Sequence, residues 1–150
     1  MTKILFVCHG NICRSPMAEC VLRELLAKRG LAGQFVVASA ATSTEEIGNP
    51  VHPGTLRVLH KQGFANCGHR AVQMTRADYD KYDLIVGMDS ANLRNILRIT
   101  GGDVQGKVRR LLDYTNTPRD IADPWYTGDF DATFRDVLAG CNALLAAITG

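Results

Sequence analysis

The sequence predicts an α/β fold, a single three-layer domain over residues 1–150 in which helices cover both faces of a four-stranded parallel sheet. Short apolar runs alternate with longer segments whose apolar residues recur at helical spacing. Strands that alternate with helices in this way pair in parallel through right-handed crossovers. No repeat or low-complexity tract interrupts the alternation, and 150 residues is the length of one domain. The predicted strands are residues 4–8, 35–38, 84–86 and 108–112.

The first strand and the first helix are clearly marked. Residues 4–8 are continuously apolar, as expected for a strand that is buried on both faces. Ser15 followed by Pro16 is typical of a helix N-cap and the first helical position. Gly30 predicts the end of this helix.

The remaining elements follow the same alternation. After the second strand, a loop rich in Thr, Ser, Gly and Pro at 42–53 leads to a helix over 53–62. A short helical turn at 78–82 precedes the third strand, and a helix over 91–99 follows it. The fourth strand leads to a loop at 116–128. The last helix is long and amphipathic, with an apolar stripe formed by Phe130, Phe134, Val137, Leu138, Cys141, Leu144, Leu145 and Ile148.

Composition narrows the class of protein. Charged residues make up 21% and hydrophobic residues 46% of the chain, which excludes a disordered or fibrous protein. A net charge of +2 is too small to indicate a nucleic acid or an anionic membrane as partner. Five cysteines, an odd number, do not form the framework of a secreted disulfide-rich protein. Because no segment has the pattern of a signal peptide or membrane span, we expect a cytoplasmic protein.

The segment from Cys8 to Pro16, Cys-His-Gly-Asn-Ile-Cys-Arg-Ser-Pro, joins the first strand to the first helix. Ligands of open parallel sheets bind beyond the carboxyl ends of the strands. The N–H groups of so tight a loop converge, and the helix N-terminus adds donors and a positive dipole end, so the segment predicts a phosphate loop. Gly10 and Asn11 are residue types that accept a positive φ, and the planar Arg14 fits phosphoryl oxygens.

Cys8 is the candidate nucleophile. The ordinary thiol pKa of about 8.5 falls beside a helix N-terminus or a cation, so we expect a thiolate at neutral pH that attacks the bound anion. Ser15 is expected to hydrogen-bond this sulfur, also when the sulfur leaves. A lone cysteine at the end of a strand is more often a small buried apolar residue, but the neighbouring residue types favour the phosphate loop.

Together these residues resemble the signature of the low-molecular-weight protein tyrosine phosphatases, a cysteine separated by five residues from Arg-Ser. The resemblance covers essentially the whole chain and keeps the family's order. It includes Ser39-Ala40, Gly48, the segment of His69, Gly87-Met88-Asp89, Asn92 and Asp123-Pro124. It implies hydrolysis of phosphotyrosine through a phosphocysteine intermediate. No His, Cys and Asp cluster has metal-ligand spacing, so we expect no metal and no other cofactor.

The resemblance also implies that Asp123 is the general acid and base. Displacement of a phenol from phosphorus needs a proton donor for the departing oxygen. Pro124 restricts Asp123 to an extended conformation, and a nearby dianion favours the protonated carboxyl. Asp120 is the competing acid, but it lacks the proline.

Supporting roles follow from the same resemblance. Asn11 is implied to hold the loop through its side chain, with Ser39 and His69 as its expected partners. Cys13 is implied to close a reversible disulfide with Cys8 that prevents irreversible oxidation. The alternative for Cys13 is a small buried residue that shapes the loop.

The remaining cysteines and histidines are given no catalytic role. Cys20 and Cys141 lie on apolar helical faces and are expected in the core, whereas Cys67 lies in a loop and is not assigned. His52 and His60 are expected to be bystanders.

In the family a slot for a phenyl ring lies between two walls. One wall corresponds to Trp125 and Tyr126, where two tyrosines are common. The other is often bulky and apolar but falls here on Glu45 or Glu46, which would repel a phosphate dianion. We therefore expect either that Glu45 points away or that the pocket is shallower and more polar. The residues expected to bind substrate are His9, Gly10, Asn11, Ile12, Cys13, Trp125 and Tyr126.

Three other functions are alternatives to phosphotyrosine hydrolysis. Phosphoarginine phosphatases resemble this loop but usually carry threonine in place of Ile12, whose apolar side chain suits an aromatic ring. An arsenate reductase needs two further neighbouring cysteines, whereas Cys67 and Cys141 lie far apart in the sequence. A non-catalytic phosphate-binding or redox-sensing module would lack the nucleophile, the arginine or the acid, and none is missing.

The expected partners follow from this function. They are phosphotyrosyl proteins, a tyrosine kinase, and inorganic phosphate as product. Neither nucleic acid nor membrane is expected, and the chain is expected to be a monomer or a weak dimer.

Overall fold

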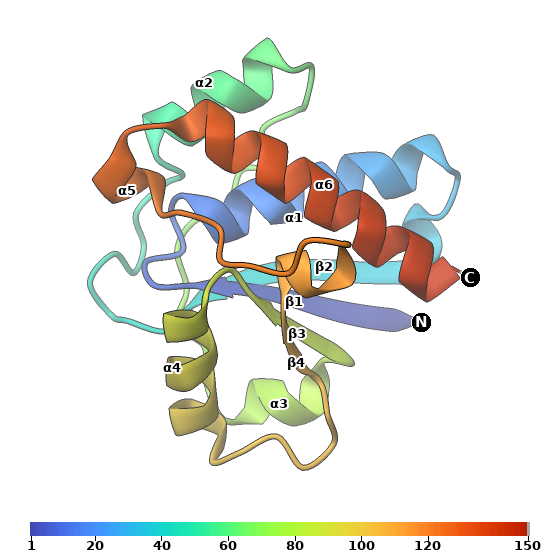
Figure 1. The fold of residues 1–150 in the computed structure, drawn as a ribbon, viewed down its shortest axis with the longest axis vertical. Coiled ribbons are helices and arrows are strands. Elements are labelled where there is room, and N and C mark those ends of the chain that lie inside the picture. Colours follow the sequence, from blue (N-terminus) through green and yellow to red (C-terminus); the bar gives the residue numbers. More distant parts are fainter. Residues whose placement is uncertain (150) are drawn as a thin grey trace.

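Four strands form one parallel sheet in the computed structural model, which describes residues 1–149. They are β1 (Thr2–Cys8), β2 (Phe35–Ala41), β3 (Leu84–Gly87) and β4 (Val108–Arg110), in the spatial order β2-β1-β3-β4 (Figure 1). β1 pairs with a neighbour on each side, so the strand that ends at Cys8 is the central element of the fold. The predicted α/β fold with a four-stranded parallel sheet is confirmed.

Helices cover both faces of this sheet. α1 (Arg14–Lys28), α2 (Pro53–Lys61) and α6 (Phe130–Thr149) lie together on one side, and α3 (Ala77–Lys81) and α4 (Ser90–Thr100) lie on the other (Figure 1). Each group buries its own apolar core against the sheet. None of the helices within residues 1–149 is long and apolar enough to cross a membrane.

Alternate residues of β1 point into the two cores. Ile4, Phe6 and Cys8 belong to the core that α1 and α6 cover, whereas Leu5 and Val7 belong to the core on the side of α4. This is the two-residue period of a strand, and burial on both faces explains why the run is continuously apolar. It also places Cys8 on the face that α1 covers.

The start of α1 differs from the prediction. The helix begins at Arg14, with Cys13 at the N-cap position and Pro16 third in the helix. The prediction that Ser15 caps the helix is wrong, because its hydroxyl contacts the side chains of Cys8 and Asn11 instead. The serine therefore belongs to the phosphate loop rather than to the helix cap.

Two short helical elements lie in segments for which the sequence predicted a strand or a loop. The fourth strand ends at Arg110, and the following residues form a 3-10 turn, η2 (Leu111–Tyr114), rather than continuing the strand. A helix of one turn, α5 (Pro124–Thr127), lies in the predicted loop over 116–128. A further 3-10 turn, η1 (Ala32–Gln34), precedes β2.

Candidate active site

The segment between β1 and α1 folds around the sulfur of Cys8. The backbone N–H of Asn11 donates to Cys8 Sγ over 3.3 Å, and Ser15 Oγ lies 2.9 Å from the same sulfur. Ser15 Oγ accepts a hydrogen bond from Asn11 Nδ2 at 2.8 Å, so its own hydrogen is free to point at Cys8. The sulfur thus lies among hydrogen-bond donors at the N-terminus of α1.

Asn11 is the centre of the loop's hydrogen-bond network. It is the one non-glycine residue within 1–149 with a positive φ, 59°, and its side chain is fully buried. Its Nδ2 also donates to Ser39 Oγ at 2.9 Å, while its Oδ1 accepts from the backbone N–H of Val72 at 3.0 Å. His69 Nε2 lies 2.5 Å from the same Oδ1. The structure thus brings Ser39 and His69 to the loop, beside Asn11.

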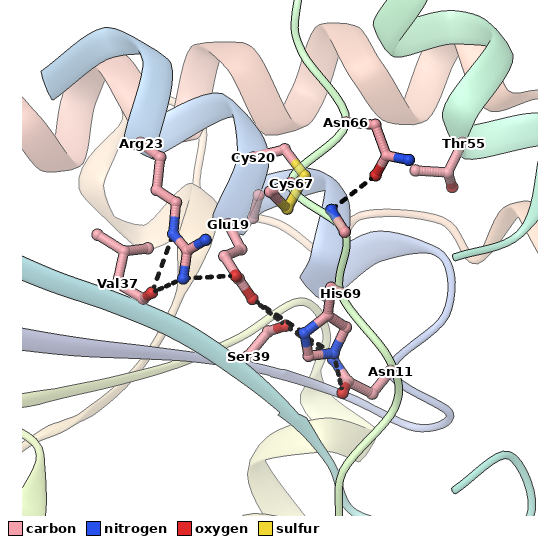
Figure 2. Close-up of a disulfide and its surroundings, with 12 residues drawn as sticks. Asn11, Glu19, Cys20, Arg23, Val37, Ser39, Thr55, Asn66, Cys67 and His69 are labelled. Atoms are coloured by element: carbon pink, nitrogen blue, oxygen red, sulfur yellow. Dashed lines mark hydrogen bonds and ion pairs between the residues drawn. A yellow bond between two sulfur atoms is a disulfide. The ribbon is translucent and has the colours of Figure 1, made fainter. Parts of the chain in front are cut away.

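Glu19 extends this network and was not expected from the sequence. Its Oε1 accepts from Ser39 Oγ at 2.7 Å and lies 3.4 Å from His69 Nδ1, and its Oε2 pairs with Arg23 at 2.8 Å (Figure 2). Burial lowers the pKa of His69, although the charge of Glu19 acts in the opposite direction. The signal that could have identified Glu19 is a carboxylate on the buried face of α1, four residues before an arginine.

Acceptors outside the phosphate loop hold the Arg14 side chain in place. Its side chain is only 2% exposed, and its Nη1 donates to Asp89 Oδ2 at 2.7 Å and to the carbonyl oxygen of Ile121 at 2.8 Å. Its Nη2 donates to Asp123 over 3.4 Å at the pocket. Burial acts to lower the pKa of Arg14, but the charge of Cys8 and the Asp89 contact outweigh it, so the pKa is raised and the guanidinium stays charged.

Asp89 belongs to the resemblance but had no predicted role, and the structure gives it one. It follows β3 and caps α4, because its Oδ1 accepts from the backbone N–H of Asn92 at 2.7 Å. Its other oxygen is thereby aimed at Arg14. The pattern that could have identified Asp89 is an acid at the carboxyl end of a strand, followed three residues later by the capping partner Asn92.

Asp123 and Asp120 have different environments. Asp123 lines the pocket and caps α5, its Oδ1 accepting from the backbone N–H of Trp125 at 3.0 Å. Asp120 instead accepts from Arg110 at 3.0 Å and from the backbone N–H of Ser90 at 2.9 Å. Burial would raise the pKa of Asp120, but these hydrogen bonds hold it below its usual value. Asp120 is therefore a fixed anion outside the pocket.

The pocket above the loop has the two predicted walls. Trp125 and Tyr126 line one side and are largely exposed, at 57% and 82%. Glu45 and Glu46 also line the pocket, so neither points away from it and part of its lining is polar. Glu45 Oε2 lies 3.2 Å from His9 Nε2, so these two side chains contact each other at the pocket. The residues that line the floor are Cys8, Gly10, Ile12, Cys13 and Arg14.

The cysteines differ from the expectation. Cys20 and Cys67 form a disulfide, whereas Cys8, Cys13 and Cys141 are buried free thiols. Cys20 lies in the core as predicted but is not a free thiol, and Cys67, which the sequence left unassigned, meets it because the loop that carries Cys67 returns to α1. The argument against an arsenate reductase from the spacing of Cys67 and Cys141 therefore loses its basis.

Cys13 is not a second nucleophile in this structure. Burial, followed by the charge of Cys8, raises its pKa to about 12, so it remains a neutral thiol at physiological pH. The structure thus holds one thiol among hydrogen-bond donors and a second, protonated thiol on the same loop.

A cysteine on an anion-binding loop, with an arginine and an acid at one pocket, defines a site for nucleophilic chemistry on a phosphate ester. Residues 3–150 match the family model of the low molecular weight phosphotyrosine protein phosphatases. The chain belongs to this family. The predicted family and enzyme class, a protein tyrosine phosphatase, are thereby confirmed.

Individual relatives agree with this assignment. The Bacillus subtilis low molecular weight protein-tyrosine-phosphatase YfkJ is 41% identical over 99% of this chain and 96% of its own, and its crystal structure matches with a TM-score of 0.96. SP-PTP of Streptococcus pyogenes is 34% identical over 100% of this chain and 95% of its own, with a TM-score of 0.89. DARP, a Drosophila arginine phosphatase, is 27% identical over 99% of both chains, with a TM-score of 0.88.

Proposed function

We propose that this chain removes phosphate from phosphotyrosine in proteins, with Cys8 as nucleophile, Arg14 as phosphate ligand and Asp123 as general acid and base. The observation that carries the proposal is the convergence of these three side chains on one pocket. Residues 1–150 would act as one phosphatase domain, which the family match over 3–150 supports.

In the first step the thiolate of Cys8 attacks phosphorus and a phosphocysteine forms, while the P–O bond to the tyrosyl oxygen breaks. The protonated Asp123 carboxyl donates its proton to that oxygen as it leaves. The phosphoryl oxygens bind the N–H groups of the loop and the guanidinium of Arg14, which stabilise the charge of the transition state. Binding of the dianion would displace the Arg14 contact of Asp123 and favour its protonated form.

In the second step water hydrolyses the phosphocysteine. The Asp123 carboxylate takes a proton from the attacking water, and Ser15 donates a hydrogen bond to the sulfur as the S–P bond breaks. Inorganic phosphate leaves, and the Cys8 thiolate is restored. Asn11, supported by Ser39 and His69, would hold the loop in its binding conformation throughout.

Substrate selection rests on the walls of the pocket. Ile12 at the floor and the rings of Trp125 and Tyr126 offer apolar contacts to a phenyl ring. The groups expected to contact substrate are His9, Gly10, Asn11, Ile12, Cys13, Trp125 and Tyr126. Cys13 would in addition form a protective disulfide with Cys8 when the site is oxidised.

Partners and location are also proposed. A tyrosine kinase would supply the phosphotyrosyl substrates, and inorganic phosphate would be released. The chain would act as a monomer or weak dimer in the cytoplasm.

The test is a comparison of phosphotyrosine, phosphoserine and phosphoarginine peptides at equal concentration. The proposal expects preferential release of phosphate from phosphotyrosine, undiminished by EDTA and abolished in Cys8→Ser. Faster turnover of phosphoarginine would instead favour the activity named for DARP, with which this chain shares its fold. Substantial activity in Cys8→Ser would contradict the covalent mechanism.

A further inference from the structure

A disulfide lies directly behind the phosphate loop. Cys20, on α1 and 3% exposed, is bonded to Cys67, in the segment that follows α2 (Figure 2). The two residues are 47 positions apart in the sequence, and their Cα atoms are 5.5 Å apart. Neither cysteine lines the pocket. The bond therefore ties a distant loop to the helix that begins at the active site.

The segment tied by this bond has few other attachments. Gly68 N–H donates to Asn66 Oδ1 within the segment, and an isolated antiparallel bridge pairs Arg70, at the end of the segment, with Pro50. The next backbone hydrogen bond to another part of the chain is that of Ala71 with Asn49. The bond at Cys67, the side-chain contacts of His69 and the bridge at Arg70 therefore place residues 65–69 together, and the bond at Cys67 is the one covalent contribution among them.

The two cysteines are adjacent to the residues that support the loop. His69 follows Cys67 by two positions, and Glu19 directly precedes Cys20. The disulfide thus joins the two backbones that carry the His69 and Glu19 side chains, which lie 3.4 Å apart and both contact Ser39 (Figure 2).

A series of side-chain contacts connects His69 with the Cys8 sulfur. His69 bonds Asn11 Oδ1, Asn11 Nδ2 donates to Ser15 Oγ, and Ser15 lies against Cys8 Sγ. Asn11 holds a positive φ that is unfavourable for a residue with a Cβ, so its conformation depends on these side-chain contacts. Loosening His69 would weaken one of them.

We propose that Cys20–Cys67 is a reversible redox site, reduced by a dithiol, whose bonded form positions His69 on Asn11 and so raises phosphatase activity. The inference rests on the proposed function. It concerns a different bond from the expected Cys8–Cys13 disulfide, which would consume the nucleophile. Here Cys8 is free while Cys20–Cys67 is closed, so the bonded form is the competent one.

The redox step is thiol–disulfide exchange with a dithiol. A thiolate of the reductant attacks Cys67, the less buried partner, so that a mixed disulfide forms and Cys20 leaves as a thiolate that takes up a proton. The second thiol of the reductant then displaces the Cys67 thiol and closes the reductant's own disulfide. Two electrons pass to the protein, which gains two protons. Disulfides in a reducing compartment are commonly of this transient kind.

The test compares wild-type protein with Cys20–Cys67 closed and after reduction by dithiothreitol, with peptide mapping to verify that Cys8 is a free thiol in both. The kcat for para-nitrophenyl phosphate and the Kd for inorganic phosphate are measured well below the unfolding temperature. We expect reduction to lower kcat and weaken phosphate binding, each by about tenfold, since small displacements of positioned groups cost up to a hundredfold. Equal values in both forms, with only a lower Tm after reduction, would mean that the bond is merely structural and would overturn the inference.

Variants separate the redox effect from other causes. Cys20→Ala/Cys67→Ala should behave like the reduced wild type in both buffers, whereas Cys141→Ala, a buried thiol outside the pair, should keep the full difference. In a His69→Gln background the effect of reduction should disappear, and its persistence would contradict the route through His69. If neither form turns over substrate, the proposed function fails, while phosphate affinity still decides the redox inference. If the double variant does not fold, reduction of the wild type remains the deciding measurement.

Discussion

Asp89 connects the stability of α4 to the position of Arg14, and its two oxygens allow the two contributions to be separated. Oδ1 caps α4 through Asn92, and Oδ2 accepts from Arg14, each at 2.7 Å. Asp89→Ala removes both interactions. Asp89→Asn keeps one carbonyl oxygen, which can still cap α4, but replaces the Oδ2 acceptor of Arg14 with an NH2 donor and removes the negative charge.

The structure allows the size of both effects to be worked out. Loss of a helix cap costs about 1 kcal/mol. Removing one partner of a buried ion pair costs about 3–5 kcal/mol, and the lower end applies because Arg14 keeps Ile121 and Asp123 as partners. We therefore expect Asp89→Ala to lower the free energy of unfolding by about 4 kcal/mol. Asp89→Asn keeps the cap but loses the ion pair, so it should cost about 3 kcal/mol.

Urea unfolding followed by circular dichroism measures these free energies, and kcat with para-nitrophenyl phosphate shows whether Arg14 stays in place. Both variants should lower kcat, since Arg14 loses the charge that orients it. A loss of only about 1 kcal/mol in Asp89→Ala, the value of the cap alone, would refute the role of the Arg14 pair. Equal free energies of unfolding for the two variants would refute the separation of the two oxygens.

Three further predictions concern other parts of the molecule. Asp123→Ala should slow hydrolysis of esters with poor leaving groups much more than those with good ones, while Asp120→Ala, the matched control, should affect both alike; the reverse pattern would assign the acid to Asp120. Because the pKa of Cys13 is raised to about 12, iodoacetamide should alkylate Cys13 slowly in a Cys8→Ser background, with a rate that rises about tenfold per pH unit and does not level off by pH 9. A plateau near pH 9 would contradict the raised pKa. Reduction of Cys20–Cys67 reopens a loop of 47 residues, which in the chain-entropy model costs about 4 kcal/mol. Scanning calorimetry should then show a Tm lower by roughly 8–16 °C for a chain of this size, and an unchanged Tm would contradict this role.

The sequence was sufficient wherever the information is local. The apolar run of β1 and the Cys8–Pro16 segment are contiguous, so their buried strand and tight loop followed from residue type and order alone. The Ser15-Pro16 pair predicted a helix N-cap, but the Ser15 hydroxyl binds Cys8 and Asn11 instead of the helix N–H groups. The hydrogen bonds of the phosphate loop therefore outweigh the preference of serine for the N-cap position.

The contacts that the sequence did not reveal join distant positions. Asp89 and Arg14 are 75 residues apart, and a capping box alone does not say what the second carboxylate oxygen will meet. The Cys20–Cys67 pairing has the same character, since connectivity cannot be deduced from cysteine spacing. The single turn of α5 is too short to have a helical period, so only Pro124 hinted at it.

Trapping of the covalent intermediate tests the central claim most directly. Asp123→Ala protein is mixed with para-nitrophenyl phosphate, rapidly denatured, and digested for mass spectrometry of the peptide that contains Cys8. A good leaving group needs little protonation, so the first step should proceed while hydrolysis of the intermediate is slowed. We predict phosphate on the Cys8 sulfur, absent in the Cys8→Ser control. Phosphate on another residue, or continued turnover without any phosphorylated Cys8 peptide, would contradict the mechanism.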